Sequence, residues 1–127
     1  MITMNLDPKD EDILAAVEAW ADVLATADYS KAISLIAALP HWSADLLERV
    51  ITNYGDPTKP PGQHRVTAPR QATGKAPTHE VDRFHDGVVE AWYDLPLDGE
   101  WSDLTATLVV KRREADSILE LQDIHIM

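Results

Sequence analysis

Residues 88–126 read VVEAWYDLPLDGEWSDLTATLVVKRREADSILELQDIHI. Within them, apolar side chains recur at about every second position in three segments, Val88–Leu95, Leu104–Arg112 and Ile118–Ile126. A period of two is typical of β-strands that present one face to a core. The last third of the chain is therefore predicted to form a sheet.

Short turn-forming sequences separate these segments, which predicts that neighbouring strands run antiparallel. His85–Gly87 contains Asp-Gly, a strong hairpin signal, and Val81–Phe84 precedes it as a further strand. Pro96–Glu100 and Glu114–Ser117 provide the next two connections. Together these patterns predict a meander of long strands.

Apolar residues before residue 55 recur at helical spacing instead, and capping residues divide this part into three helices. We expect Asp7 to cap the first helix with Pro8 at its first position, followed by an apolar stripe from Ile13 to Leu24. Capping by Asp28 or Ser30 and termination by Pro40 mark a second helix that buries Ala32, Ile33, Ile36 and Ala37. The third helix is predicted to begin after Ser43 and to end at Gly55.

These elements predict an α+β fold, in which three N-terminal helices pack on a curved, mainly antiparallel sheet of about four to five strands. The length of 127 residues favours a single domain, residues 1–127. A Pro-rich connection over residues 56–79 joins the two parts, contains a short strand at His64–Thr67, and is expected to be the least ordered internal segment.

The composition excludes several classes of function. A formal net charge of -11 repels nucleic acid phosphates and anionic lipid, and it would speed encounter with a basic partner. The absence of cysteine removes disulfides and thiolate chemistry, and it suits a reducing cytosol. No long apolar run or basic leader is visible, so we expect neither membrane insertion nor a signal peptide.

Asp123 and His125 are the first candidate site, and two interpretations are open. A β-bulge near Gln122 would bury Ile124 and Ile126 and leave Asp123 and His125 in water. Without a bulge, the Asp-His pair would lie on the helix-covered face. There it could act as an oriented base in a small pocket enzyme, assisted by Tyr93 or Trp92.

The connection around Trp101 is the second candidate site. Trp42 and Trp101 lie beside loops, where an indole is either a lid on the core or an anchor for a partner. The carboxylates near Trp101 would surround such an anchor with negative charge; they are Asp94, Asp98, Glu100 and Asp103.

The sequence contains no motif for metal binding, phosphate binding or serine-hydrolase chemistry. The five histidines show no H-x-x-x-H or H-x-H spacing, so no metal site is expected. Gly-rich phosphate loops and the G-x-S-x-G elbow are also absent, and no cofactor is expected.

The order of the elements resembles the cone-shaped nuclear-transport-factor-like (cystatin-related) α+β fold. WYDLPLDGEWSDLTAT (residues 92–107) and LQDIHIM (residues 121–127) are similar to segments of a set of short bacterial proteins with no assigned activity. This likeness implies a cytoplasmic bacterial protein. Members of the wider fold are pocket enzymes or non-catalytic binding and dimerisation modules, so the resemblance leaves the function open.

We therefore expect a non-catalytic binding or interaction module, such as one that neutralises a basic protein like a toxin. The alternative is a small pocket enzyme of isomerase, dehydratase or cyclase type that uses the Asp-His pair. A homodimer is expected through the sheet face opposite the helices, which would carry Val88, Trp92, Val109 and the Ile124/Ile126 pair.

Overall fold

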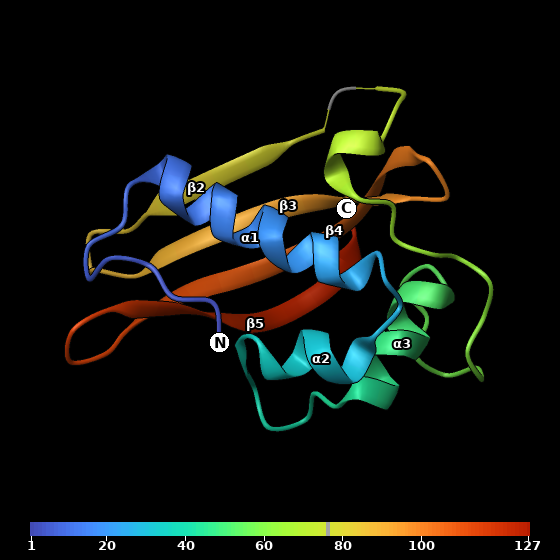
Figure 1. Cartoon of the computed structure of the whole chain (residues 1–127), viewed down its shortest axis with the longest axis horizontal. Coiled ribbons are helices and arrows are strands. Elements are labelled where there is room, and N and C mark those ends of the chain that lie inside the picture. Colours follow the sequence, from blue (N-terminus) through green and yellow to red (C-terminus); the bar gives the residue numbers. More distant parts are fainter. Residues whose placement is uncertain (76) are drawn as a thin grey trace.

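A computed structural model of the chain describes residues 1–75 and 77–127. Its helices are α1 (Asp10–Leu24), α2 (Tyr29–Ser34), α3 (Ala44–Thr52) and the 3-10 helix η1 (Pro69–Gln71). Its strands are β1 (Ala37–Ala38), β2 (His79–Arg83), β3 (Val89–Leu97), β4 (Glu100–Arg112) and β5 (Ser117–Ile126). The strands form one open sheet in the order β1-β5-β4-β3-β2 (Figure 1). The predicted α+β class, with N-terminal helices and a mainly antiparallel sheet, is confirmed.

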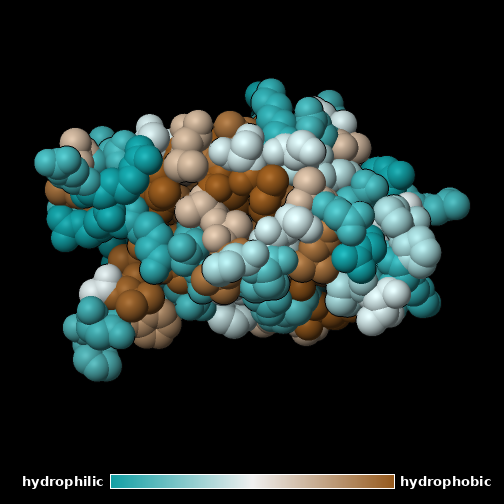
Figure 2. Space-filling model, turned by 90° about the horizontal axis from the view of Figure 1, so that it is seen from below, coloured by the Kyte–Doolittle hydropathy of each residue, from teal (hydrophilic) through white to brown (hydrophobic). Residues whose placement is uncertain are grey.

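The core lies between α1 and one face of the sheet, while α2 and α3 lie on the side of β5 (Figure 1). Leu95, Leu104, Leu108 and Leu121 of the sheet are fully buried, as is Trp20 of α1. Seen from below, apolar patches lie across the left and middle of the surface, interrupted by hydrophilic residues, while the right end is mainly hydrophilic (Figure 2). The apolar faces of the helices and of the strands thus pack together in one core.

The face of the sheet away from α1 is called here the outer face. It carries the side chains that alternate with those of the core face, and it includes Trp92 and Asp94 of β3, Thr105 and Thr107 of β4, and Glu80 of β2. The candidate site lies on this face.

The first helix begins later than expected. Its N-cap is Lys9, whose backbone N–H donates to the Asp12 carboxylate at 3.0 Å, so the prediction of Asp7 as the cap is wrong. Arg83 of β2 binds the Pro8 carbonyl at 2.9 Å and the Asp10 carboxylate at 2.8 Å. This tertiary contact holds Pro8 outside the helix.

The second helix ends earlier than expected. Asp28 caps α2 as predicted, but α2 stops at Ser34 and not at Pro40. Ala37 and Ala38 then pair in parallel with Glu120 and Leu121 of β5. A two-residue strand therefore occurs where only helix was expected, because the edge of β5 offers backbone hydrogen-bond partners that a continued helix would leave unused.

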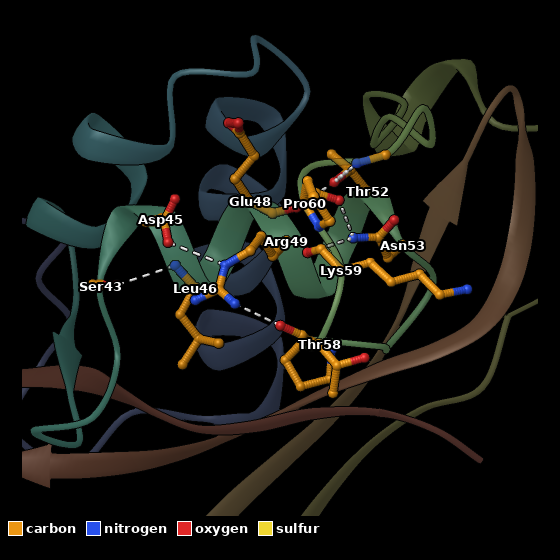
Figure 3. A network of polar contacts seen from close by, with 12 residues as sticks. Ser43, Asp45, Leu46, Glu48, Arg49, Thr52, Asn53, Thr58, Lys59 and Pro60 are labelled. Carbon is orange, nitrogen blue, oxygen red and sulfur yellow. Dashed lines mark hydrogen bonds and ion pairs between the residues drawn. The ribbon is translucent and has the colours of Figure 1, made fainter.

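The third helix follows the prediction closely. The Ser43 hydroxyl accepts a hydrogen bond from Leu46 N–H at 3.1 Å, and Gly55, with a φ of 89°, follows the end of α3. The connection after it is bonded to α3 (Figure 3). Arg49 donates to the Pro57 carbonyl at 2.6 Å, and Asn53 donates to the Pro60 carbonyl at 2.8 Å.

The remainder of the connection is anchored to the turn between β3 and β4. Val66 is buried and forms a single bridge with Leu97, so the strand expected at His64–Thr67 is not formed. His64 and Arg65 bind the Asp98 carboxylate instead of a neighbouring strand. The expectation that residues 56–79 are the least ordered internal segment stays a prediction, and Ala76 within it lies outside the described residues.

Gly62 gives a direct test of this packing. A Cβ atom at Gly62 would lie 2.3 Å from Asn53 Oδ1 and 2.5 Å from the Thr52 carbonyl oxygen. Gly62→Ala is therefore expected to push the connection off α3 and to lower the free energy of unfolding by about 1–3 kcal/mol, measured by urea denaturation. Gln63→Ala, at an exposed neighbour, is the matched control. Equal stabilities of the two variants would contradict the packing.

The turn between β3 and β4 is shorter than expected. Strand β3 continues through Leu97 and β4 begins at Glu100, so the loop consists of Asp98 and Gly99 alone. Both have positive φ, 53° and 93°, as a type I′ hairpin turn requires.

The bulge near Gln122 is confirmed. Leu108 pairs with Leu121 and Thr107 pairs with Asp123, which leaves Gln122 as the extra residue. Its carbonyl accepts a hydrogen bond from the Trp42 indole at 3.2 Å, and Trp42 packs against the core as a lid. The bulge turns Ile124 into the core, at 4 % exposure, but Ile126 is 48 % exposed and its predicted burial is wrong.

Candidate functional site

A pocket of about 500 Å³ opens where the outer face meets the start of β4. Its walls combine carboxylates with aromatic rings and hydroxyl groups. The carboxylates are Glu80, Asp94 and Asp103, the aromatic rings are Tyr54, Trp92 and Trp101, and the hydroxyl groups are Thr78, Ser102 and Thr105. Lys75, Pro77 and Met127 complete the lining among the described residues.

Asp94 is held in the pocket wall by two hydrogen bonds. Its Oδ2 accepts from Thr78 N–H at 2.9 Å, and its Oδ1 accepts from the Thr105 hydroxyl at 2.8 Å. Thr105 is 1 % exposed, so the donor is itself fixed in the sheet. The carboxylate is therefore preorganised, and each oxygen keeps a lone pair for a further donor.

An irregularity in the pairing of β3 and β4 shapes the pocket wall. Asp94 pairs with Thr105, but Pro96 pairs with Trp101, so three residues of β4 lie opposite Leu95 alone. The Ser102 hydroxyl donates to the Leu95 carbonyl at 2.6 Å and holds this bend. Asp103 accepts a hydrogen bond from the Tyr54 hydroxyl, which connects the end of α3 to the pocket.

Trp101 contacts both the core and the pocket. Its ring meets the rings of His79 and Tyr93 edge-on, with centroids 5.2 and 6.4 Å away. His79 and Tyr93 stack on each other at 3.7 Å with an angle of 8° between the ring planes. The indole is half-buried and packs against the core, as a lid does, and Trp101 also borders the pocket. The alternative role of Trp101 as an anchor for a partner stays a prediction.

Burial of His79 predicts a pH dependence of stability. Burial lowers the pKa of His79, although the Asp94 carbonyl and the Asp94 and Glu18 charges oppose it. As the pH falls through about 6.5, the unfolded chain takes up this proton before the folded chain does, so stability decreases between neutral pH and the lowered pKa of His79. Denaturation from pH 7.5 to 5 should show this decrease, and His79→Gln should flatten it. His85→Gln, in an exposed turn, is the matched control; an equal slope in wild type and His79→Gln would contradict the prediction.

Two of the carboxylates expected around Trp101 lie outside the pocket. Asp98 is 2.6 Å from His64 Nδ1 and accepts from Arg65 N–H at 3.0 Å. The hydrogen bond from His64 holds the pKa of Asp98 below its usual value. Glu100 is exposed beside Gly74. Of the predicted partner-binding residues, the structure therefore brings Asp94, Trp101 and Asp103 together.

Asp123 and His125 lie together, but the sheet separates them from Tyr93, the third candidate catalytic residue. Asp123 Oδ2 lies 3.0 Å from His125 Nδ1 on the outer face, without hydrogen-bond geometry, and the Asp123 side chain is 61 % exposed. Tyr93 is on the α1 face and 2 % exposed, and burial raises its pKa. Trp92 meets the His125 ring edge-on at 6.0 Å, but Tyr93 cannot join this pair.

Some pocket residues were not anticipated. Glu80 could have been placed there, because it pairs with Trp92 and alternation puts both on one face. Tyr54, Lys75 and Thr78 come from outside the long strands, and no sequence signal marks them.

Comparison of the chain with models of protein families, with curated proteins and with solved structures found no match. Among residues 1–75 and 77–127, no cluster of three or more His, Asp or Glu side chains is arranged to bind a metal ion. Within the same residues, the helices are too short or too polar to cross a membrane.

Proposed function

We propose that the chain is a non-catalytic binding module that engages a basic protein partner through the pocket and the outer face. The observation that carries this proposal is the pocket itself, where preorganised and free carboxylates stand beside aromatic rings. Such a surface attracts cations by charge and retains them by contact with the rings.

The rest of the outer face supports the proposal. Alternation along the strands places Glu80, Asp82, Glu90, Asp94, Glu120 and Asp123 on it. Lys111 also lies there and is 3.6 Å from Glu120. These carboxylates lie on the face that holds the pocket, where they would steer a basic protein, such as a toxin, toward Trp92.

A labelled hexalysine peptide tests the proposal by fluorescence anisotropy. Binding is expected at low salt and should weaken steeply between 50 and 200 mM salt, because charge drives the encounter. Asp94→Asn and Trp92→Ala should each weaken binding by about tenfold. Asp7→Asn is the matched control, because Asp7 is exposed and pairs with Arg112 outside the pocket.

Three results would contradict the proposal: no binding at low salt, binding that salt does not affect, or an equal loss from Asp7→Asn. A labelled hexaglutamate peptide, which should not bind, controls for the label. Circular dichroism of each variant verifies that it is folded.

The homodimer expected from the sequence stays a proposal. Its apolar contribution is smaller than expected, since Ile124 lies in the core, while Trp92 and Val109 remain half-buried on the outer face. The carboxylates around them would repel a second copy of the same face. The mass in solution, measured by light scattering, distinguishes a homodimer from a monomer.

A further inference from the structure

The pocket has a charge and a size that suit a single organic cation. Its side-chain carboxylates, Glu80, Asp94 and Asp103, outnumber the one basic side chain among the described lining residues, Lys75. The volume of about 500 Å³ is in the range of sites that hold one small ligand. A partner protein would therefore insert one basic side chain here and contact the outer face with others.

The aromatic walls are fixed before any ligand arrives. The Trp92 indole N–H donates to the Glu90 carboxylate, which restrains the ring on the outer face. Trp101 is held by its edge contacts with His79 and Tyr93. Rings that are already fixed lose little conformational entropy when a ligand binds. Their contact with a cation therefore contributes more of its free energy to the affinity.

The arrangement of Asp94 favours a guanidinium over an ammonium group. Both of its oxygens are oriented by neighbouring donors, from Thr78 and Thr105, and both keep a free lone pair. Two oxygens presented together match the planar fork of arginine, which binds carboxylates through two parallel hydrogen bonds. The guanidinium plane also stacks on indole rings and is less strongly hydrated than the ammonium group of lysine.

We propose that this pocket receives one arginine side chain of the partner, with its guanidinium group bound to Asp94 and stacked against Trp92. This inference rests on the proposed function and adds the identity of the recognised side chain. Glu80 and Asp103 supply further negative charge around the same group.

The test uses three single-residue probes, the N-acetyl N′-methylamides of arginine, lysine and citrulline. Citrulline has nearly the shape of arginine but no charge. Titrations are followed by the indole N–H signals in ¹H–¹⁵N NMR spectra of the full chain. The arginine probe is expected to bind about tenfold more tightly than the citrulline probe and several-fold more tightly than the lysine probe. The Trp92 indole signal should shift most.

Variants assign the effect to the pocket. Asp94→Asn keeps the size of the side chain and should remove most of the preference for arginine over citrulline. Glu80→Gln, at an exposed position, should reduce this preference by a smaller factor. It provides the test of the pocket if Asp94→Asn does not fold. Trp92→Phe should retain binding that Trp92→Ala loses, and Asp7→Asn should change nothing.

Equal binding of arginine and citrulline, or lysine binding as tightly as arginine, would overturn the inference. If hexalysine still binds in a salt-dependent way, the proposed function survives that failure. If neither hexalysine nor the arginine probe binds, both proposals fail. Arginine binding that Asp94→Asn and Glu80→Gln leave unchanged would also overturn the assignment to this pocket.

Discussion

Replacing Trp20 by alanine is expected to lower the free energy of unfolding by about 3–5 kcal/mol. The Trp20 side chain has 0 % exposure and is among the largest fully buried side chains. Its indole N–H donates to the Ala32 carbonyl at 3.1 Å, so one side chain fills the core beneath α1 and joins α1 to α2. The substitution removes the apolar contacts and the hydrogen bond together.

Urea denaturation, monitored by far-UV circular dichroism, measures this loss of stability. Trp20→Phe separates the two contributions, because phenylalanine keeps much of the apolar volume but cannot donate to Ala32. Trp92→Ala is the matched control on the outer face, where the indole is half-buried and lies outside the core cluster. If Trp20→Ala costs no more than Trp92→Ala, Trp20 does not have the position described.

Replacing Ile124 by aspartate is expected to cost about 4 kcal/mol or more and to leave the chain largely unfolded. Ile124 is 4 % exposed because the bulge at Gln122 returns it to the core face of β5. An aspartate there would place an unpaired charge among apolar side chains.

Asp123→Ala is the matched control, one residue away on the outer face. Its side chain is 61 % exposed, so a change within about 0.5 kcal/mol is expected. Both variants are compared by thermal and urea denaturation. The reverse order, a stable Ile124→Asp and an unstable Asp123→Ala, would mean that β5 has no bulge and that Asp123 faces the core.

The elements whose signals are local were predictable. Ser43 and Asp28 cap their helices as expected, because a hydroxyl or carboxylate beside free N–H groups acts within one turn. The expectation that Trp92 lies on the sheet face opposite the helices is also confirmed. The bulge near Gln122 was one of the two alternatives that the sequence left open. Strict alternation from Leu121 would turn Ile124 away from the core, and one extra residue returns it.

The candidate site was predictable only in part. The connection around Trp101 suggested Asp94 and Asp103, which do converge, but it also suggested Asp98 and Glu100, which do not. These residues are equally close in sequence. They separate because the two-residue turn points Asp98 toward His64, whereas the irregular pairing of β4 turns Asp103 toward the pocket.

Contacts between distant segments account for the remaining differences from the sequence-based predictions. Arg83 holds Pro8 outside α1, and the edge of β5 draws Ala37 and Ala38 out of a helix into a strand. Capping and periodicity established the class of fold, because each acts through neighbours in the chain, and composition alone established the net negative charge. Which carboxylates meet which rings depends instead on long-range pairing and backbone hydrogen bonds, whose partners are identified only when the chain is folded.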